Sequence, residues 1–81
     1  MINIVYEPES HRSAAYDGDQ VIGVCEYEVN GNEWLITHTV VSPEYGGQGI
    51  ARKLVLLVAD KAKEAGKTIV PICSYAVKVL G

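Results

Sequence analysis

The sequence predicts an α+β fold, in which an antiparallel β meander precedes a long helix, a last strand and a short C-terminal helix. Two turn dipeptides, Asp17-Gly18 and Asn30-Gly31, separate β-type segments in the first half of the chain. Apolar side chains recur between residues 50 and 62 at the spacing of an amphipathic helix. Three glycines within residues 46–49 lie between these two parts. A chain of 81 residues has room for one domain, which we expect to span residues 1–81.

Four β-type segments make up the predicted meander. They cover residues 2–6, 12–16, 21–29 and 33–41, and β-branched or aromatic residues are frequent in the last two. Strict alternation in the third segment places Val21, Cys25, Tyr27 and Val29 on one face of the sheet. The Asn-Gly pair after this segment is the strongest hairpin dipeptide in the chain.

The second half of the chain predicts a helix, a strand and a helix. The main helix is expected over residues 47–65, and Gly66 suits the position just beyond a helix end. Its core-facing stripe comprises Ile50, Leu54, Leu57, Val58 and Ala62. Residues 68–72 form the last strand, and residues 74–80 form the terminal helix. A helix that joins two strands of one sheet implies a right-handed crossover, so the last strand runs parallel to the central strand that precedes the helix.

Composition and charge argue against several classes of function. The formal net charge is −3, with seven Lys and Arg residues, so no nucleic-acid partner is expected. No apolar run reaches the roughly 18 residues that cross a membrane. The two cysteines and two histidines show no metal-ligand spacing, so no metal is expected. Without a disulfide framework or a signal-peptide pattern, the predicted location is the cytoplasm. The oligomeric state is left open.

The glycine-rich turn at residues 46–49 is a candidate anion site. The order strand, glycines, helix exposes backbone N–H groups at a helix N-terminus, where the helix dipole adds partial positive charge. Glycines also let a phosphate approach the backbone closely. The turn does not match the P-loop pattern. It does not match the dinucleotide-binding pattern either, because Arg52 occupies the position of that pattern's third glycine. The alternative is a plain strand-to-helix turn.

This turn resembles the pyrophosphate loop of the GCN5-related N-acetyltransferases, whose pattern is Arg or Gln, two residues, Gly, one residue, then Gly or Ala. Gly49 and Ala51 match, whereas Gly46 stands at the Arg or Gln position and removes one side-chain contact to the cofactor. Two further motifs resemble a small single-domain branch of the family. They are His38-Thr39 before the turn and Pro71-Ile72-Cys73-Ser74-Tyr75 after it. The resemblance covers roughly residues 11–80.

The resemblance implies a minimal form of the family's fold and an acetyl-CoA-dependent N-acetyltransferase. The pyrophosphate of acetyl-CoA would lie on the turn, with Gly46, Gly47, Gln48, Gly49, Ile50, Ala51 and Arg52 as binding residues. The pantetheine arm would pair with the backbone of Thr39, Val40 and Val41, where family members have splayed strands near a bulge. The acceptor would be a small amine or a Lys side chain, whose identity the sequence does not specify.

Cys73 and Tyr75 are candidate catalytic residues near the C-terminus. Cys73 lies between the last strand and the terminal helix, and a thiol at a helix N-terminus has an increased thiolate fraction. The alternative role for Cys73 is that of a small core residue. By resemblance, Tyr75 would protonate the leaving CoA thiolate, although an aromatic ring packed over the core edge explains it equally well. Cys25, within a strand, is expected to be core.

His38 is the third catalytic candidate because it is the one histidine within a predicted strand. It would act as a general base or hold the substrate amine, unless it is a half-buried side chain bonded to a backbone carbonyl. Strict alternation predicts that its face is shared with Trp34, Ile36 and Val40. The family branch usually has Glu after His-Thr, so Val40 removes one acid–base candidate.

Three functional hypotheses follow. The first is an N-acetyltransferase that transfers the acetyl group from acetyl-CoA to an amine, either directly or through an acetyl-Cys73 intermediate. The second is a non-catalytic module that binds CoA or an acyl-CoA. The third is a structural or interaction domain in which the glycine-rich segment is only a turn.

Overall fold

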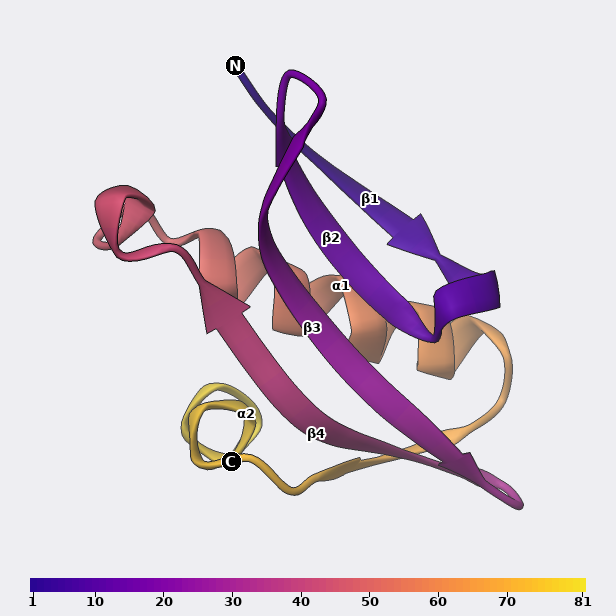
Figure 1. Cartoon of the computed structure of the whole chain (residues 1–81). Helices are drawn as coiled ribbons and strands as arrows, with labels where there is room; N and C mark the ends of the chain where they lie inside the picture. The colour runs from indigo at the N-terminus through magenta and orange to yellow at the C-terminus, as the bar shows by residue number, and fades with distance from the viewer.

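A computed structural model describes all 81 residues of the chain as five strands in one sheet with two α-helices (Figure 1). The elements are β1 (Ile2–Glu7), β2 (Arg12–Asp17), β3 (Gln20–Asn30), β4 (Glu33–Val41), α1 (Ile50–Glu64), β5 (Thr68–Pro71) and α2 (Ser74–Leu80), with short 3-10 turns at Pro8–Ser10 and Pro43–Tyr45. The spatial order of the strands equals their order in the sequence. Strands β1 to β4 are antiparallel, and β5 pairs in parallel with β4, which confirms the predicted α+β architecture. Neither α-helix is long and apolar enough to cross a membrane.

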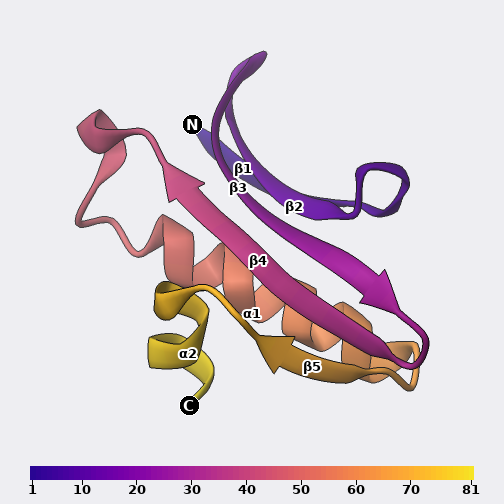
Figure 2. The ribbon, with the colours of Figure 1, turned by 60° about the horizontal axis from the view of Figure 1, so that its bottom comes forward.

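Helix α1 covers one face of the sheet, and the core lies between the two layers (Figures 1 and 2). The α1 residues buried there are Ile50, Leu54, Val55, Val58 and Ala62. Ala15, Ile22, Cys25, Tyr27, Trp34 and Ile36 come from the sheet, and Ala76 comes from α2. The predicted stripe is therefore correct except at one position, because Val55 is fully buried and Leu57 only partly. No helix covers the other face of the sheet, which we call the open face.

A bulge in β3 changes the predicted face of its first residues. Ala15 pairs with Gly23 and Tyr16 with Val21, so Ile22 has no partner in β2. The extra residue turns Ile22 into the core, whereas Val21 remains 41% exposed. The expectation that Val21 shares the face of Cys25 and Tyr27 is therefore wrong.

A second bulge lies in β4. Tyr27 pairs with Ile36 and Glu26 with His38, so Thr37 is the extra residue. The bulge reverses the alternation of side chains beyond it. Thr39 consequently points to the core side, where its hydroxyl contacts the buried Cys25, and His38 points to the open face.

Strand β5 is shorter than β4 and leaves part of its edge free. β5 pairs only with Glu33–Ile36 of β4. The N–H groups of Ile72 and Cys73 both donate to the Ile36 carbonyl, and the chain then enters α2. Figures 1 and 2 both show α2 beside the C-terminal half of β4, where no strand pairs with that edge.

Candidate active site

The turn between β4 and α1 has the backbone conformation that its glycines predict. Gly47 and Gly49 have φ values of +78° and +75°, in the left-handed region that favours glycine. Gly49 caps α1 without any side-chain hydrogen bond, and the first helical bond runs from the Lys53 N–H to the Gly49 carbonyl. The preceding N–H groups of the helix therefore have no intrahelical acceptor. A Cβ placed on either glycine would meet nothing within 4 Å, so these groups border open space.

A hollow of about 330 Å³ lies beside this turn. Its walls combine the end of β4, the turn, the start of α1 and the first turn of α2. They include Val41, Gly46, Gly47, Gly49, Ile50, Ala51 and Tyr75. The structure thus brings Tyr75, from near the C-terminus, to the predicted anion site in the middle of the sequence. Free N–H groups, a helix N-terminus and a hollow that no side chain fills suit a pyrophosphate.

The free edge of β4 continues from this hollow. The Ser42 N–H donates to the Ile22 carbonyl of β3 at 2.8 Å. Backbone groups alternate in direction along an antiparallel strand, so Val40 and His38 also face β3. Thr39 and Val41 then present their N–H and C=O groups to the opposite edge, beyond the end of β5. Two of the three residues predicted to pair with pantetheine therefore face the free edge, and the backbone of Val40 does not.

Cys73 lies further along the same edge. Its sulfur lies 3.4 Å from Thr39 Oγ1 and accepts the Ala76 N–H at 3.3 Å, which caps α2. The side chain is partly buried and packs against the core without lining the hollow. Thr39 lies between the hollow and Cys73. It is the next residue beside Val41 that faces the free edge of β4, and its hydroxyl contacts the Cys73 sulfur.

The other thiol is unsuited to covalent chemistry. Cys25 is 0% exposed, as expected of a core residue. Burial raises the pKa of the Cys25 thiol to about 11, so it stays protonated near neutral pH.

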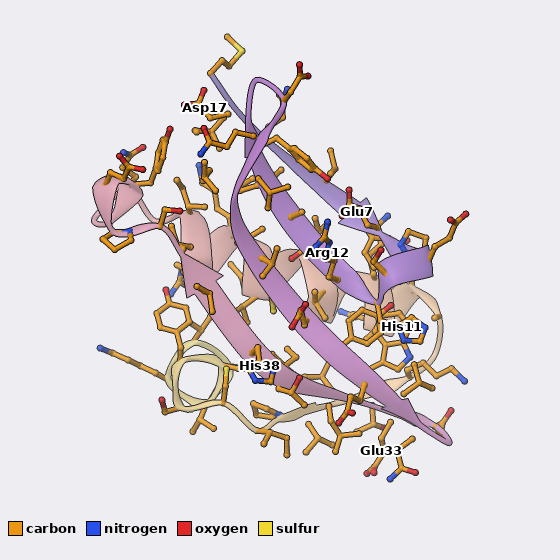
Figure 3. The ribbon with its side chains drawn as sticks, viewed as in Figure 1. Glu7, His11, Arg12, Asp17, Glu33 and His38 are labelled. Atoms are coloured by element: carbon orange, nitrogen blue, oxygen red, sulfur yellow. The ribbon has the colours of Figure 1, made fainter.

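His38 lies apart from these groups. Its side chain is 69% exposed, and Nδ1 lies 3.9 Å from Glu26 Oε1. Figure 3 shows His38 on the open face together with Arg12, on the side of the sheet away from α1. The prediction that His38 shares the face of Trp34 and Ile36 is wrong, because the Thr37 bulge lies between them. The structure therefore does not bring His38 together with Cys73.

One residue beside the turn has a role that the sequence does not predict. Tyr45 lines the hollow. Its hydroxyl also donates to Asp17 Oδ2 at 2.5 Å, which ties the turn to the β2–β3 hairpin. This bond lowers the pKa of Asp17 and raises the pKa of Tyr45. The two residues are 28 positions apart, so no local pattern could have indicated the contact.

Loss of this bond should weaken binding at the turn. We expect Tyr45→Phe to reduce CoA affinity a few-fold, because the glycines keep their conformation but the turn loses its hydrogen bond to Asp17. Tyr16→Phe is a matched control, since it removes a tyrosine–carboxylate bond to Glu7 elsewhere in the sheet. Calorimetric titration of both variants checks this prediction. Equal affinities in the two variants would show that the Asp17 contact does not position the turn.

Comparison with known proteins agrees with this geometry. The family model described as GCN5-related N-acetyl-transferase matches residues 12–81. No functionally curated protein is a significant match.

Several solved structures share the fold. A probable acetyltransferase from meticillin-resistant Staphylococcus aureus is 20% identical, with a TM-score of 0.66 over 85% of this chain and 55% of that chain. A GNAT family acetyltransferase from Streptococcus pneumoniae is 26% identical, with a TM-score of 0.62 over 78% of this chain and 48% of that one. An IAA acetyltransferase from Bacillus cereus is 26% identical, with a TM-score of 0.65 over 85% of this chain and 48% of that chain. The chain spans about half the length of these proteins.

Proposed function

Because the chain belongs to the GCN5-related N-acetyltransferase family, we propose that it transfers an acetyl group from acetyl-CoA to an amine. The observation that carries the proposal is the glycine turn, whose free N–H groups border the hollow shared with Tyr75. Val41 lines the hollow, and Thr39 further along the free edge of β4 contacts the Cys73 sulfur, so residues of one edge link the turn to a thiol.

Binding would use mainly backbone groups. The N–H groups from Gly47 to Ala51 would receive the pyrophosphate at the start of α1, because the Gly46 N–H already donates to the Pro43 carbonyl. Thr39 and Val41 would pair with the pantetheine amides in the manner of an added strand. Gln48 and Arg52 are both exposed, and Arg52 in the first turn of α1 would supply a positive charge in place of the missing side chain at Gly46.

Cys73 is the residue that we assign to receive the acetyl group. Its thiolate would attack the acetyl carbonyl, so that a C–S bond to Cys73 forms as the C–S bond to CoA breaks. CoA leaves as a thiolate, and Tyr75 in the wall of the hollow would give it a proton. A neutral amine would then attack acetyl-Cys73, so that the amide C–N bond forms as the C–S bond to Cys73 breaks. The Cys73 thiolate is freed, and the amine proton restores Tyr75 by way of solvent.

The acceptor is proposed only as a class. The acidic chain favours a small cationic amine or a Lys side chain, which must lose a proton before it attacks. His38 and Glu26 lie together on the open face. The Glu26 carboxylate is therefore placed to attract such a cation, and His38 beside it is not placed to act on Cys73.

One observation favours a second function, a module that binds CoA or acyl-CoA without catalysis. The bulge at Thr37 keeps His38 away from Cys73, so the one histidine of the strands cannot act as its base. The anion site itself needs no such base. This function shares the binding step of the proposed enzyme and lacks only the transfer.

Titration calorimetry with CoA and acetyl-CoA tests the binding step that both functions require. We expect saturable heat that decreases as salt is added, because the pyrophosphate charge contributes to affinity. Absence of heat and of any thermal shift at millimolar CoA would contradict both functions.

A further inference from the structure

A single hydroxyl lies between the two thiols of the chain. Thr39 Oγ1 lies 3.6 Å from Cys25 Sγ and 3.4 Å from Cys73 Sγ. Cys25 is opposite Thr39 in the register of β3 and β4, and Cys73 follows β5 on the other side of β4. The Thr37 bulge makes this contact, because it turns the Thr39 side chain toward the core.

The Thr39 hydroxyl can donate its proton in a hydrogen bond to only one of the two sulfurs at a time. A threonine hydroxyl has one proton and two lone pairs. The geometry makes Thr39 the donor to Cys25 Sγ, and Cys25 is fully buried and protonated. With its proton on that side, Thr39 presents a lone pair to Cys73 and accepts the Cys73 S–H. This arrangement favours the neutral thiol at Cys73.

The thiolate of Cys73 requires the opposite arrangement. A lone pair facing a negative sulfur is repulsive, whereas an O–H group directed at it is attractive and strengthened by the charge. Rotation about the Cβ–Oγ bond of Thr39 turns its O–H group away from the Cys25 sulfur and toward the Cys73 sulfur. The Cys73 sulfur keeps the Ala76 N–H at 3.3 Å in both states. Cys25 loses only a weak hydrogen bond to sulfur.

We propose that Thr39 is a positioning residue that adjusts the reactivity of Cys73, and that buried Cys25 competes with Cys73 for the Thr39 proton. The catalytic consequence rests on the proposed function, but the contacts involve no CoA. The neighbouring elements contribute few other titratable or charged groups. They are Glu26 beside Cys25 in β3, His38 beside Thr39 in β4, and Tyr75 and Lys78 on α2, while the α1 face toward the sheet is apolar.

Alkylation of the full chain by iodoacetamide tests the proposal in the absence of CoA. The rate at Cys73 is followed over a range of pH by mass spectrometry of the modified peptide. Thr39→Val keeps the side-chain shape and removes the hydroxyl, so we expect a rate near neutral pH roughly three- to tenfold lower and a profile displaced to higher pH. Thr39→Ser should restore the parent profile. Cys25→Ala should move the profile the other way, to lower pH, because the competing acceptor is gone.

A packing control separates this effect from a loosened core. Ile36→Val removes one buried methyl group from β4 without touching the Thr39 proton, and it should alkylate like the parent. Unchanged profiles in both Thr39→Val and Cys25→Ala would overturn the proposal, as would acceleration in Ile36→Val equal to that in Cys25→Ala. Because iodoacetamide needs no cofactor site, a protein that shows these shifts but binds no CoA would refute only the proposed function.

Discussion

Gly49→Val should abolish CoA binding while the protein still folds. Gly49 has a φ of +75° at the N-terminus of α1, and an added Cβ would project into open space. We expect that space to hold the pyrophosphate, so the valine side chain would displace it from the backbone N–H groups. Hydrogen bonds to a charged group contribute about 1.5–3 kcal/mol each, so the loss of two lowers affinity about 100-fold or more.

Gly31→Val provides a matched control for the backbone strain of this substitution. Gly31 has a φ of +60° in the β3–β4 turn, and a Cβ there also meets nothing within 4 Å. Both variants should therefore lose similar stability in urea denaturation, because valine is strained at positive φ. Only Gly49→Val should lose the calorimetric signal for CoA. If Gly49→Val binds CoA as tightly as Gly31→Val, the turn is not the pyrophosphate site.

Cys73→Ser should lose acetyl transfer by several orders of magnitude and keep CoA binding. The hydroxyl is far less nucleophilic than a thiolate, and loss of a nucleophile reduces turnover on this scale. Serine is also a favourable N-cap, so it replaces the sulfur that now accepts the Ala76 N–H. Helix α2 should therefore stay in place, and a lost activity would not result from unfolding. Cys73→Ala should behave in the same way but with a less stable α2.

Turnover of an amine substrate with acetyl-CoA, measured as released CoA thiol, checks this second prediction. Calorimetry on the same samples should show parent-like CoA affinity, because the proposed anion site lies on the turn and not at Cys73. Normal turnover in Cys73→Ser would favour direct attack of the amine on acetyl-CoA. Cys73 would then have only its packing and capping roles.

Local patterns were sufficient to predict the order of the elements and most of their limits. The helix predicted over residues 47–65 is an exception, because α1 begins at Ile50 and the left-handed Gly47 and Gly49 belong to the turn before it. The Asn30-Gly31 turn places β4 at residues 33–41, as predicted, and α2 covers the predicted residues 74–80. Gly66 has a φ of +72° just beyond α1, as the helix-ending position predicts. These features depend on neighbours in the sequence, so the sequence is sufficient to predict them.

The orientation of side chains was less predictable because two bulges change it. Ile22 and Thr37 each add one residue to a strand, and neither position carries a glycine or proline that would indicate it. The Thr37 bulge reverses the predicted face of His38 and directs Thr39 to both thiols. These contacts depend on how β3, β4 and β5 pair with one another, and the pairing cannot be predicted from any one of these segments alone.

Intact-protein mass spectrometry after incubation with acetyl-CoA tests most directly the claim that the acetyl group passes through Cys73. We expect a mass gain of one acetyl group, located on Cys73 by peptide mapping, which disappears when an amine acceptor is added. Cys73→Ser under the same conditions should show no rapid gain. If the parent protein binds acetyl-CoA and acetylates the amine while Cys73 remains unmodified at every time point, the acetyl group does not pass through Cys73.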